Sequence, residues 1–561
     1  MAHRRFVPDP DGPRSLFGSG PFTDRRSFLK TLGVGAAASV ATGAVSLPGA
    51  ANDVEACEVG PLDNIARRQA AFQTRKNAAK LAAERLLPSH PCNNEETNYP
   101  FIANFTKGLP HDALGEVDPL AYDKMLQALS SGDPADFEAI PLGGTRKLRN
   151  PQAGLAFDLE GPDSHHLQIR PAPRIDGPEH SSEMGEMYWH AILRDLAFTD
   201  YAGDATAAAA AADMSLFSDF KGPKVGGVVT PQTLFRTNAP GVPVGPYVSQ
   251  FMLKDVPYGT QVIRQTQLNA VAGVDYMMTF PEWLSVQRGI APVLTDQFEA
   301  VPRYMRTGRD LATYVHFDAL YQAYLNACLI LLGMGVPTNP GNPYNGYAKT
   351  DAFGTFGGPH ILSLVTEVAT RALKAVWYQK WYVHRRARPE VFGGRVDTHV
   401  RGVKSYPIDS EILNSGALAE SLGRYGTALL PQAYPEGSPL HPSYGSGHTT
   451  VAGACVTILK AWFDTTGVFP DPVVPSADGL SLVPYAGADA GDMTIEGELN
   501  KVACNVSFAR NFAGIHWRTD STASMKLGEK VAIGILEEQK ASYAEPHSFT
   551  FRKFDGTMIT I

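Results

Sequence analysis

Three short stretches in the last third of the chain contain the residue types that hold a tetrahedral oxyanion. They supply Lys380 and Arg388, then Ser446, Gly447 and His448, and finally Arg510 and His516. Arginine and lysine give fixed positive charge, a serine hydroxyl and a glycine N–H give neutral donors, and histidine titrates near neutral pH. No carboxylate cluster accompanies them, which argues against a magnesium or zinc phosphatase. The combination predicts an oxyanion site in which one histidine transfers protons and the other is a nucleophile or ligand.

The middle stretch, "HPSYGSGHTT", begins with His441, seven residues before His448. The residues ahead of it are rich in proline and glycine and are therefore predicted to form a loop. Apolar residues then recur every three or four positions from Val451 to Trp462, which predicts a helix that begins just after His448. Free backbone N–H groups at a helix start favour an anion. A simple serine N-cap beside a loop histidine would give the same pattern, so this stretch alone leaves both interpretations open.

The other two stretches also place their basic residues at helix ends. Apolar positions from Ile361 to Val376 predict a buried helix face, and the helix should stop just before Pro389 because proline disfavours helical geometry at the preceding residue. We expect Arg385 and Arg386 to be a solvent-facing basic helix end. A further helix is predicted from about Asp520, whose carboxylate could orient an imidazole or an arginine, or cap the helix.

The order and spacing of these motifs resemble those of the vanadium-dependent haloperoxidases and the related type-2 phosphatidic acid phosphatases. The matching residues are Lys380 with Arg388-Pro389, Ser446-Gly447-His448, and Arg510 with Gly514 and His516. The eight-residue step from Lys380 to Arg388, together with His441, is similar to the algal and cyanobacterial bromoperoxidase branch. Upstream, "KLRNPQAGLAFDLEGPDS" and "VHFDALYQAYLNAC" extend the resemblance over most of the chain.

The resemblance implies a mainly α-helical fold of four-helix bundles, with long loops, little sheet and the site at one end of a bundle. It implies that His516 binds vanadate as the axial ligand. The remaining oxygens would be held by Lys380, Arg388, Arg510, Ser446 and the Gly447 N–H. His448 would be the acid–base residue, His441 would adjust His448 or the halide preference, and Lys380 would make the bound oxidant more electrophilic. Asp318 would contact an active-site arginine.

The implied reaction uses hydrogen peroxide to oxidise bromide or iodide to a hypohalous acid, which halogenates organic acceptors. His441 resembles the bromoperoxidase position, which is phenylalanine in fungal chloroperoxidases. Trp377 instead resembles the tryptophan of those chloroperoxidases, although it could simply pack the helix. We expect chloride oxidation to be weak or absent. The resemblance also implies a homo-oligomer, as a dimer or a dodecamer, and a structural calcium ion whose ligands the sequence does not identify.

Two other functions use the same residues. In a soluble acid phosphatase of the same superfamily, His516 would attack phosphorus to form a phosphohistidine while the same donors held phosphate. A noncatalytic oxyanion-binding or shell-forming protein is a third possibility, which would leave His448 without an acid–base task.

The N-terminal stretch indicates export. Arg25 and Arg26 begin "RRSFLK", and an uncharged run rich in alanine and glycine follows from Thr31 to Leu47. This pattern resembles a twin-arginine signal over residues 1–51, and predicts a periplasmic or extracellular protein. The alternative, a membrane-anchoring helix, is disfavoured because the run is short and weakly hydrophobic.

Length and composition limit the remaining interpretations. At 561 residues the chain should contain one large core with insertions or two merged domains, for which we place a boundary near residue 300, giving regions 52–300 and 301–561. A net charge of −8 argues against nucleic acid as a partner. No segment is predicted to span a membrane in the mature form. The five cysteines show no CxxC pair, and Cys57 and Cys92 could form a disulfide after export.

Overall fold

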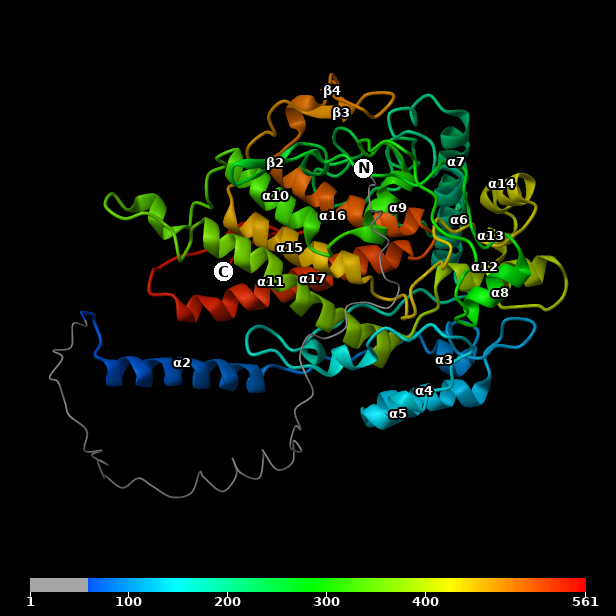
Figure 1. The fold of residues 1–561 in the computed structure, drawn as a ribbon, viewed down its shortest axis with the longest axis horizontal. Helices are drawn as coiled ribbons and strands as arrows, with labels where there is room; N and C mark the ends of the chain where they lie inside the picture. The colour runs from blue at the N-terminus through cyan, green and yellow to red at the C-terminus, as the bar shows by residue number, and fades with distance from the viewer. Residues whose placement is uncertain (1–58) are drawn as a thin grey trace, which may run out of the picture. The chain divides into compact units, whose positions relative to one another are not determined.

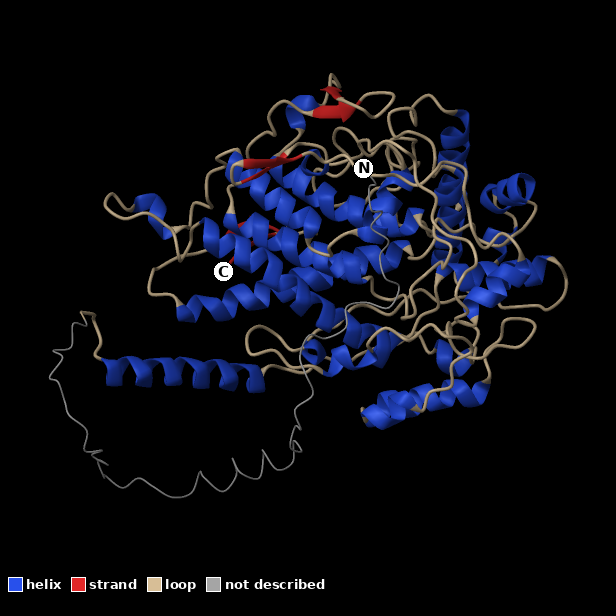
Figure 2. Ribbon diagram, viewed as in Figure 1, coloured by secondary structure: helices blue, strands red, loops and turns tan. Residues whose placement is uncertain are grey.

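The computed structural model describes residues 59–561, in which helices dominate and strands are few and short (Figure 2). The twin-arginine signal and Cys57 lie outside the described residues. The chain divides into a unit that ends at Arg68 and a second unit from Gln69 to Ile561, and the site lies within the second.

The helices and strands have the following bounds. The α-helices are α2 (Asn64–Glu84), α3 (Glu95–Asn98), α4 (Pro119–Ser131), α5 (Pro134–Glu138), α6 (Pro178–Ile192), α7 (Ala205–Leu216), α8 (Phe280–Gln287), α9 (Gly308–Phe317), α10 (Gln322–Gly333), α11 (Gly358–Tyr378), α12 (Pro389–Val400), α13 (Ser410–Leu413), α14 (Gly416–Tyr425), α15 (Gly447–Trp462), α16 (Ile495–Phe512) and α17 (Arg518–Gln539). The 3-10 turns are η1 (Pro151–Leu155), η2 (Ser164–His166), η3 (Gln250–Met252), η4 (Pro343–Gly346), η6 (Ala490–Asp492) and η7 (Lys540–Ser542), and η5 (Gln379–His384) is a π-helix. The strands are β1 (Val256–Tyr258), β2 (Gln261–Ile263), β3 (Val473–Pro475), β4 (Leu482–Pro484), β5 (Thr550–Arg552) and β6 (Met558–Thr560).

The strands form three antiparallel pairs, β1 with β2, β3 with β4 and β5 with β6, and none of these pairs joins a larger sheet within residues 59–561. Val256 pairs with Ile263, Val473 with Pro484, and Thr550 with Thr560 at the ends of the three ladders. The pairs are surface hairpins, and the prediction of a mainly α-helical chain with little sheet is confirmed.

Helix α15 lies at the centre of a bundle formed with α11, α16 and α17 (Figure 1). Every residue of α15 except His448 is buried. The apolar face predicted for α11 from Ile361 to Val376 is also buried. The main hydrophobic core joins these helices to α6, α7, α9 and α10, so it contains residues from both sides of residue 300.

Glycine allows α15 and α17 to approach unusually closely. A Cβ atom on Gly453 would overlap the carbonyl oxygen of Met525, and one on Gly528 would overlap the carbonyl oxygen of Thr450. Any larger side chain would therefore separate the two helices. This separation matters because the start of α15 and the loop before α17 carry residues of the predicted site.

The helix predicted to stop just before Pro389 has a different end. Helix α11 stops at Tyr378, the π-helix η5 follows, and Arg385 adopts a left-handed backbone conformation with a φ of 41°. A new helix, α12, begins at Pro389 with Arg388 at its N-cap position. Arg388 has an extended backbone, as the following proline predicts, but the helical run already ends at His384, four residues earlier. Proline also suits the first position of α12, where its fixed φ fits and no N–H is needed.

Arg385 and Arg386 are not a solvent-facing helix end, so that prediction is also wrong. Arg385 donates two hydrogen bonds of 2.6 Å to Glu96. Arg386 is 3% exposed and forms ion pairs with Glu183 at 2.7 Å and with Asp520 at 3.1 Å. Since the chain leaves helical geometry at Arg385, both side chains turn towards carboxylates from other segments.

The basic, alanine-rich segment near residue 64 forms α2, and the alanine run after Thr206 lies in α7. From Ile140 to Gly177 the chain has only the short turns η1 and η2, which pack on α11. In the part of the chain described, no single helix has the length and hydropathy needed to cross a membrane, and only α9 and α10 taken together pass that test, with a bend of 100° between them.

We predict that Gly528→Ala lowers the free energy of unfolding by about 1–3 kcal/mol, because the added methyl group must push α17 away from α15. Gly423→Ala is the matched control: it lies in α14 with nothing within 4 Å of the added Cβ, and should stabilise by about 0.5–1 kcal/mol through helix propensity. Urea denaturation of both variants measures the difference. Equal stability of Gly528→Ala and the wild type would show that the helices do not pack this closely.

Candidate active site

The predicted site residues meet at the ends of five elements. Lys380 lies in η5, Arg388 caps α12, Ser446 and Gly447 begin α15, Arg510 is in the last turn of α16, and His516 lies in the loop before α17. Helix α9 packs on α16 and brings Asp318, its C-cap residue, to the same place. Segments far apart in the sequence therefore supply one cluster of polar side chains at one end of the bundle.

Arg388 connects the two outer parts of this cluster. Its Nε donates to the His441 carbonyl at 3.0 Å, and its Nη1 donates to the Ile515 carbonyl and to His516 Nε2, both at 2.8 Å. Its Nη2 lies 2.9 Å from His441 Nδ1. The side chain is fully buried, and burial lowers the pKa of Arg388 to about 9, with Asp520 opposing that effect. Arg388 thus remains a cation at neutral pH, in contact with neutral partners.

Lys380 is a second fully buried cationic side chain. Its Nζ donates to the carbonyl oxygens of Pro442 at 2.7 Å and Ser443 at 3.0 Å. Burial and the charge of Arg388 lower the pKa of Lys380 well below its usual value. The two carbonyl bonds fix the position of the ammonium group and leave its third donor position available.

Arg510 completes the set of basic side chains. It is 7% exposed, its Nη1 donates to the Val315 carbonyl at 2.9 Å, and its Nε is buried without a partner. Within residues 59–561, neither Lys380, Arg388 nor Arg510 forms an ion pair with a carboxylate. Burying positive charge in this way is costly unless an anion joins it.

The carboxylate of Asp520 is near these basic side chains but forms its hydrogen bonds with other groups. It accepts from His516 Nδ1 at 2.8 Å, from the Trp517 N–H at 3.1 Å and from Arg386 at 3.1 Å, and it also contacts the Ser443 hydroxyl. It therefore orients an imidazole, pairs with an arginine and caps α17 at the same time.

The protonation of His516 follows from its two contacts. Because Arg388 donates to Nε2, that nitrogen must carry its lone pair, and the hydrogen lies on Nδ1, which donates to Asp520. Burial, followed by the charges of Arg388 and Lys380, lowers the pKa of His516 well below its usual value. His516 is therefore a neutral imidazole whose Nε2 can act as a ligand or nucleophile.

His448 has a different environment. Its side chain is 18% exposed, and its Nε2 lies 3.0 Å from Asp318 Oδ1. Burial alone would raise the pKa of Asp318, but His448 and Arg510 hold that pKa below its usual value. Asp318 is thus an ionised partner of His448, and the expectation that it contacts an active-site arginine is replaced by this histidine contact.

Ser446 and Gly447 supply the neutral donors. The Ser446 hydroxyl oxygen accepts a long bond of 3.4 Å from the Thr449 N–H, so the serine caps α15 while its own hydrogen stays available. Gly447 is the first residue of α15, and its N–H has no partner within the helix. A Cβ on Gly447 would lie 3.0 Å from the Trp377 ring, so glycine keeps this position open.

His441 lies against Arg388 and Trp377. Its ring centroid is 4.8 Å from that of Trp377, whose Nε1 donates to the Arg149 carbonyl at 3.1 Å. Burial, together with Lys380 and Arg388, lowers the pKa of His441 well below its usual value. The two residues that gave opposite indications about halide preference are therefore direct neighbours.

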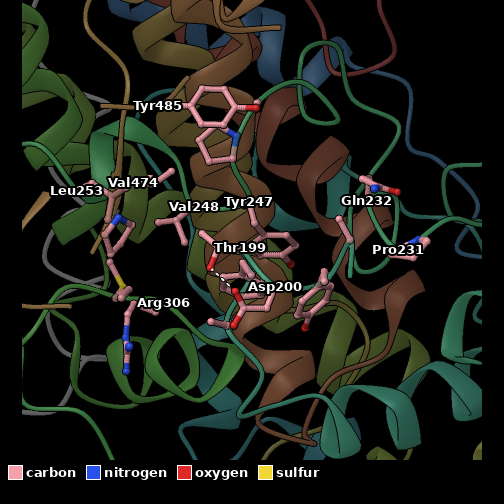
Figure 3. Close-up of a pocket in the computed structure, with 18 of the residues that line it drawn as sticks. Thr199, Asp200, Pro231, Gln232, Tyr247, Val248, Leu253, Arg306, Val474 and Tyr485 are labelled. Atoms are coloured by element: carbon pink, nitrogen blue, oxygen red, sulfur yellow. Dashed lines mark hydrogen bonds between the residues drawn. The ribbon is translucent and has the colours of Figure 1, made fainter. Parts of the chain in front are cut away.

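A separate cavity of about 460 Å³ contains none of the predicted site residues (Figure 3). Its walls include Tyr247 and Tyr485, and its polar groups are largely paired with one another: Thr199 with Asp200 at 3.1 Å, and Tyr485 with Asp489 at 2.6 Å. A small oxyanion needs little room, so this larger space does not compete with the polar cluster as the candidate active site.

Comparison with known proteins identifies the kind of site. Vanadium-dependent bromoperoxidase of Corallina pilulifera is 39% identical over 598 residues, covering 89% of this chain and 100% of that protein. The chain belongs to the vanadium-dependent haloperoxidase family. The bromoperoxidases of Corallina officinalis, 38% identical, and Ascophyllum nodosum, 36% identical, cover 89% and 88% of the chain, and 100% and 92% of their own lengths.

Two further matches support membership of the haloperoxidase family. Residues 360–544 match the family model described as the VCPO second helical-bundle domain, which includes all of the predicted site residues. The solved homohexameric second vanadate-dependent bromoperoxidase of Ascophyllum nodosum is similar with a TM-score of 0.85 and 29% identity, covering 94% of this chain and 95% of that chain. The haloperoxidase fold expected from the sequence motifs is therefore confirmed.

Sequence reasoning missed three contacts of this haloperoxidase site. It gave no role to Glu183 in α6, it placed Arg386 in solvent, and it gave Asp318 the wrong kind of partner. No local pattern marks these residues, because each contact joins positions more than 120 residues apart. For Asp520 the sequence did suggest an imidazole partner, with an arginine partner or a helix cap as alternatives.

We predict that Asp520→Asn weakens vanadate binding by about 10–100-fold, because the loss of the carboxylate removes the group that orients His516. Glu183→Gln is the matched control, since it removes the other carboxylate partner of Arg386 without touching His516. It should lower stability while changing vanadate affinity much less. Vanadate titration of both folded variants tests this, and equal affinities would contradict the assigned role of Asp520.

Proposed function

We propose that this haloperoxidase uses vanadate and hydrogen peroxide to oxidise bromide or iodide to a hypohalous acid that halogenates organic acceptors. The observation that carries the proposal is the accumulation of three buried basic side chains, without carboxylate contacts in the described chain, around the neutral Nε2 of His516. The bromoperoxidase relatives, which match nearly the whole chain, support the same function.

The donor set fits vanadate. A tetrahedral oxyanion would satisfy the orphaned Nε of Arg510 and balance the buried charge of Lys380 and Arg388. The residues that would hold it are His516 through Nε2, Lys380, Arg388, Arg510, Ser446 and the Gly447 N–H. Bound vanadate supplies a Lewis acid that activates peroxide towards halide.

Lys380 and the arginines act through position and charge. Their bonds to backbone carbonyls hold them in place before any ligand arrives, which makes them preorganised donors in a site of low dielectric constant. Lys380 is the compact point charge of the set, so it is the group best suited to draw electron density from a single bound oxygen atom.

His448 is suited to proton transfer. The ionised Asp318 fixes the orientation of the imidazole, while partial exposure allows proton exchange with solvent. His441, which is buried against Arg388, would position that guanidinium and modify halide preference with Trp377.

The alternative functions receive less support. A soluble acid phosphatase would use His516 Nε2 as the nucleophile and the same donors to hold phosphate, but none of the relatives described above is a phosphatase. A noncatalytic oxyanion-binding or shell-forming protein would have no use for the pair formed by His448 and Asp318.

The proposal also includes the oligomeric state of the chain, a structural calcium ion and export from the cytoplasm. The Ascophyllum nodosum structure is described as a homohexamer, which supports a homo-oligomer for this chain. Export by the twin-arginine route to the periplasm or the exterior rests on residues 1–51 alone. The structural calcium ion implied by the sequence resemblance remains a prediction.

We predict that protein stripped of bound oxyanion regains bromide- and peroxide-dependent halogenation only when vanadate is added. Iodide should also be oxidised, and chloride at equal concentration should react much more slowly. Steady-state halogenation with each halide, with and without vanadate, measures this. Phosphatase activity that vanadate inhibits, without halogenation, would overturn the proposed function, and chloride turnover as fast as bromide would overturn the halide preference.

We predict that His516→Ala abolishes vanadate binding, because it removes the Nε2 ligand. His448→Ala should retain binding but lose turnover by about 10²–10⁴-fold, the usual contribution of a general acid–base group. Vanadate titration and steady-state kinetics separate the two effects. Similar losses of vanadate affinity in both variants would contradict the assigned roles.

A further inference from the structure

A second cluster of metal-ligand side chains lies outside the active site, at the short turn η2 in the long loop between η1 and α6. Asp163, His165 and His166 each bring one ligand atom, and these atoms lie within 4.8 Å of one another. None of the three belongs to the proposed vanadate site. The spacing is short enough for a single metal ion to contact all three groups.

The ligand atoms of this cluster are not used elsewhere in the described chain. Asp163 Oδ1 accepts from the Asp158 N–H at 3.0 Å, which leaves its second oxygen available. Among residues 59–561, the ring nitrogens of His165 and His166 form no hydrogen bond, and His166 Nδ1 is buried without a partner. A buried imidazole nitrogen without a partner is unfavourable, and a metal ion would satisfy it.

The loop that carries the cluster is fixed at several points. The Gly161 N–H donates to Glu538 in α17 at 2.6 Å, and Gln379 Nε2 donates to the Leu167 carbonyl at 2.8 Å. Lys374 of α11 pairs with Asp158, and Arg371 of α11 contacts the Glu160 carbonyl. These contacts hold the chain on both sides of the three ligand residues in place without a metal, as a preorganised site requires.

We propose that Asp163, His165 and His166 bind a divalent transition-metal ion, for which Zn²⁺ is the probe. Two imidazoles and one carboxylate suit zinc and its neighbours, whereas calcium and magnesium prefer oxygen ligands throughout. All three residues are partly exposed, so water completes the coordination. The ion links the N-cap residue of η2 to two residues of that turn, and its binding to the folded state raises thermal stability.

The test uses the vanadate-loaded enzyme, freed of divalent metal, so that His516 is already occupied. Calorimetric titration with Zn²⁺ should give one ion per chain, together with a rise in Tm of several degrees. The double variant His165→Ala/His166→Ala should lose both effects. His399→Ala is the control, because it removes another partly exposed histidine far along the chain and should leave Zn²⁺ binding unchanged.

A second, more conservative variant keeps the test valid if the double variant does not fold. Asp163→Asn preserves the side-chain volume and removes the charge, so it should bind Zn²⁺ at least tenfold more weakly while halogenation with vanadate persists. Failure of the wild-type enzyme to bind Zn²⁺ would overturn the proposal. Undiminished binding by Asp163→Asn or the double variant would also overturn it, since the ion would then bind elsewhere, for example at the exposed Cys92.

Discussion

Buried positive charge without carboxylate contact organises the active site of this haloperoxidase. Lys380, Arg388 and Arg510 are held by backbone carbonyls, which fix their positions but do not neutralise their charge. Isolated charges of this kind are unfavourable inside a protein, and their cost is tolerated here because the site is built for an anion. Burial, and then the positive field that would hold the oxyanion, lower the pKa of His516 and keep its ring neutral.

The surrounding fold keeps carboxylates from neutralising this excess of positive charge. Asp520 lies close enough to neutralise the cluster, but Arg386 and His516 share its carboxylate, and Glu183 further anchors Arg386. The glycine contacts between α15 and α17 set the distance between the Ser446-Gly447 donors and the His516 loop. Asp520 and the closely packed glycines therefore contribute both to the stability of the fold and to the arrangement of the oxyanion donors.

The sequence was most informative where the signal is local. The apolar faces of α11 and α15 predicted both helices, and the grouping of basic, small and imidazole residues at helix ends predicted which side chains would meet. It placed the end of the first helix four residues too late, because no local pattern marks the left-handed backbone at Arg385. It also failed at Arg386, because the partners of this arginine lie on α6 and α17. The contact between Asp318 and His448 joins residues 130 positions apart, and a single sequence does not indicate such a pairing.

The contact between His441 and Trp377 has a consequence for how halide preference can evolve. The Trp377 ring also lies beside Gly447. One aromatic side chain therefore neighbours both His441, which is bonded to Arg388, and the residue that supplies a backbone donor to the oxyanion site. Substitutions at positions in contact have non-additive energies. A change at His441 or Trp377 would therefore alter which residues are tolerated at the other position. The two positions should covary among related enzymes, and exchanging either residue alone between two enzymes would transfer little of the halide selectivity.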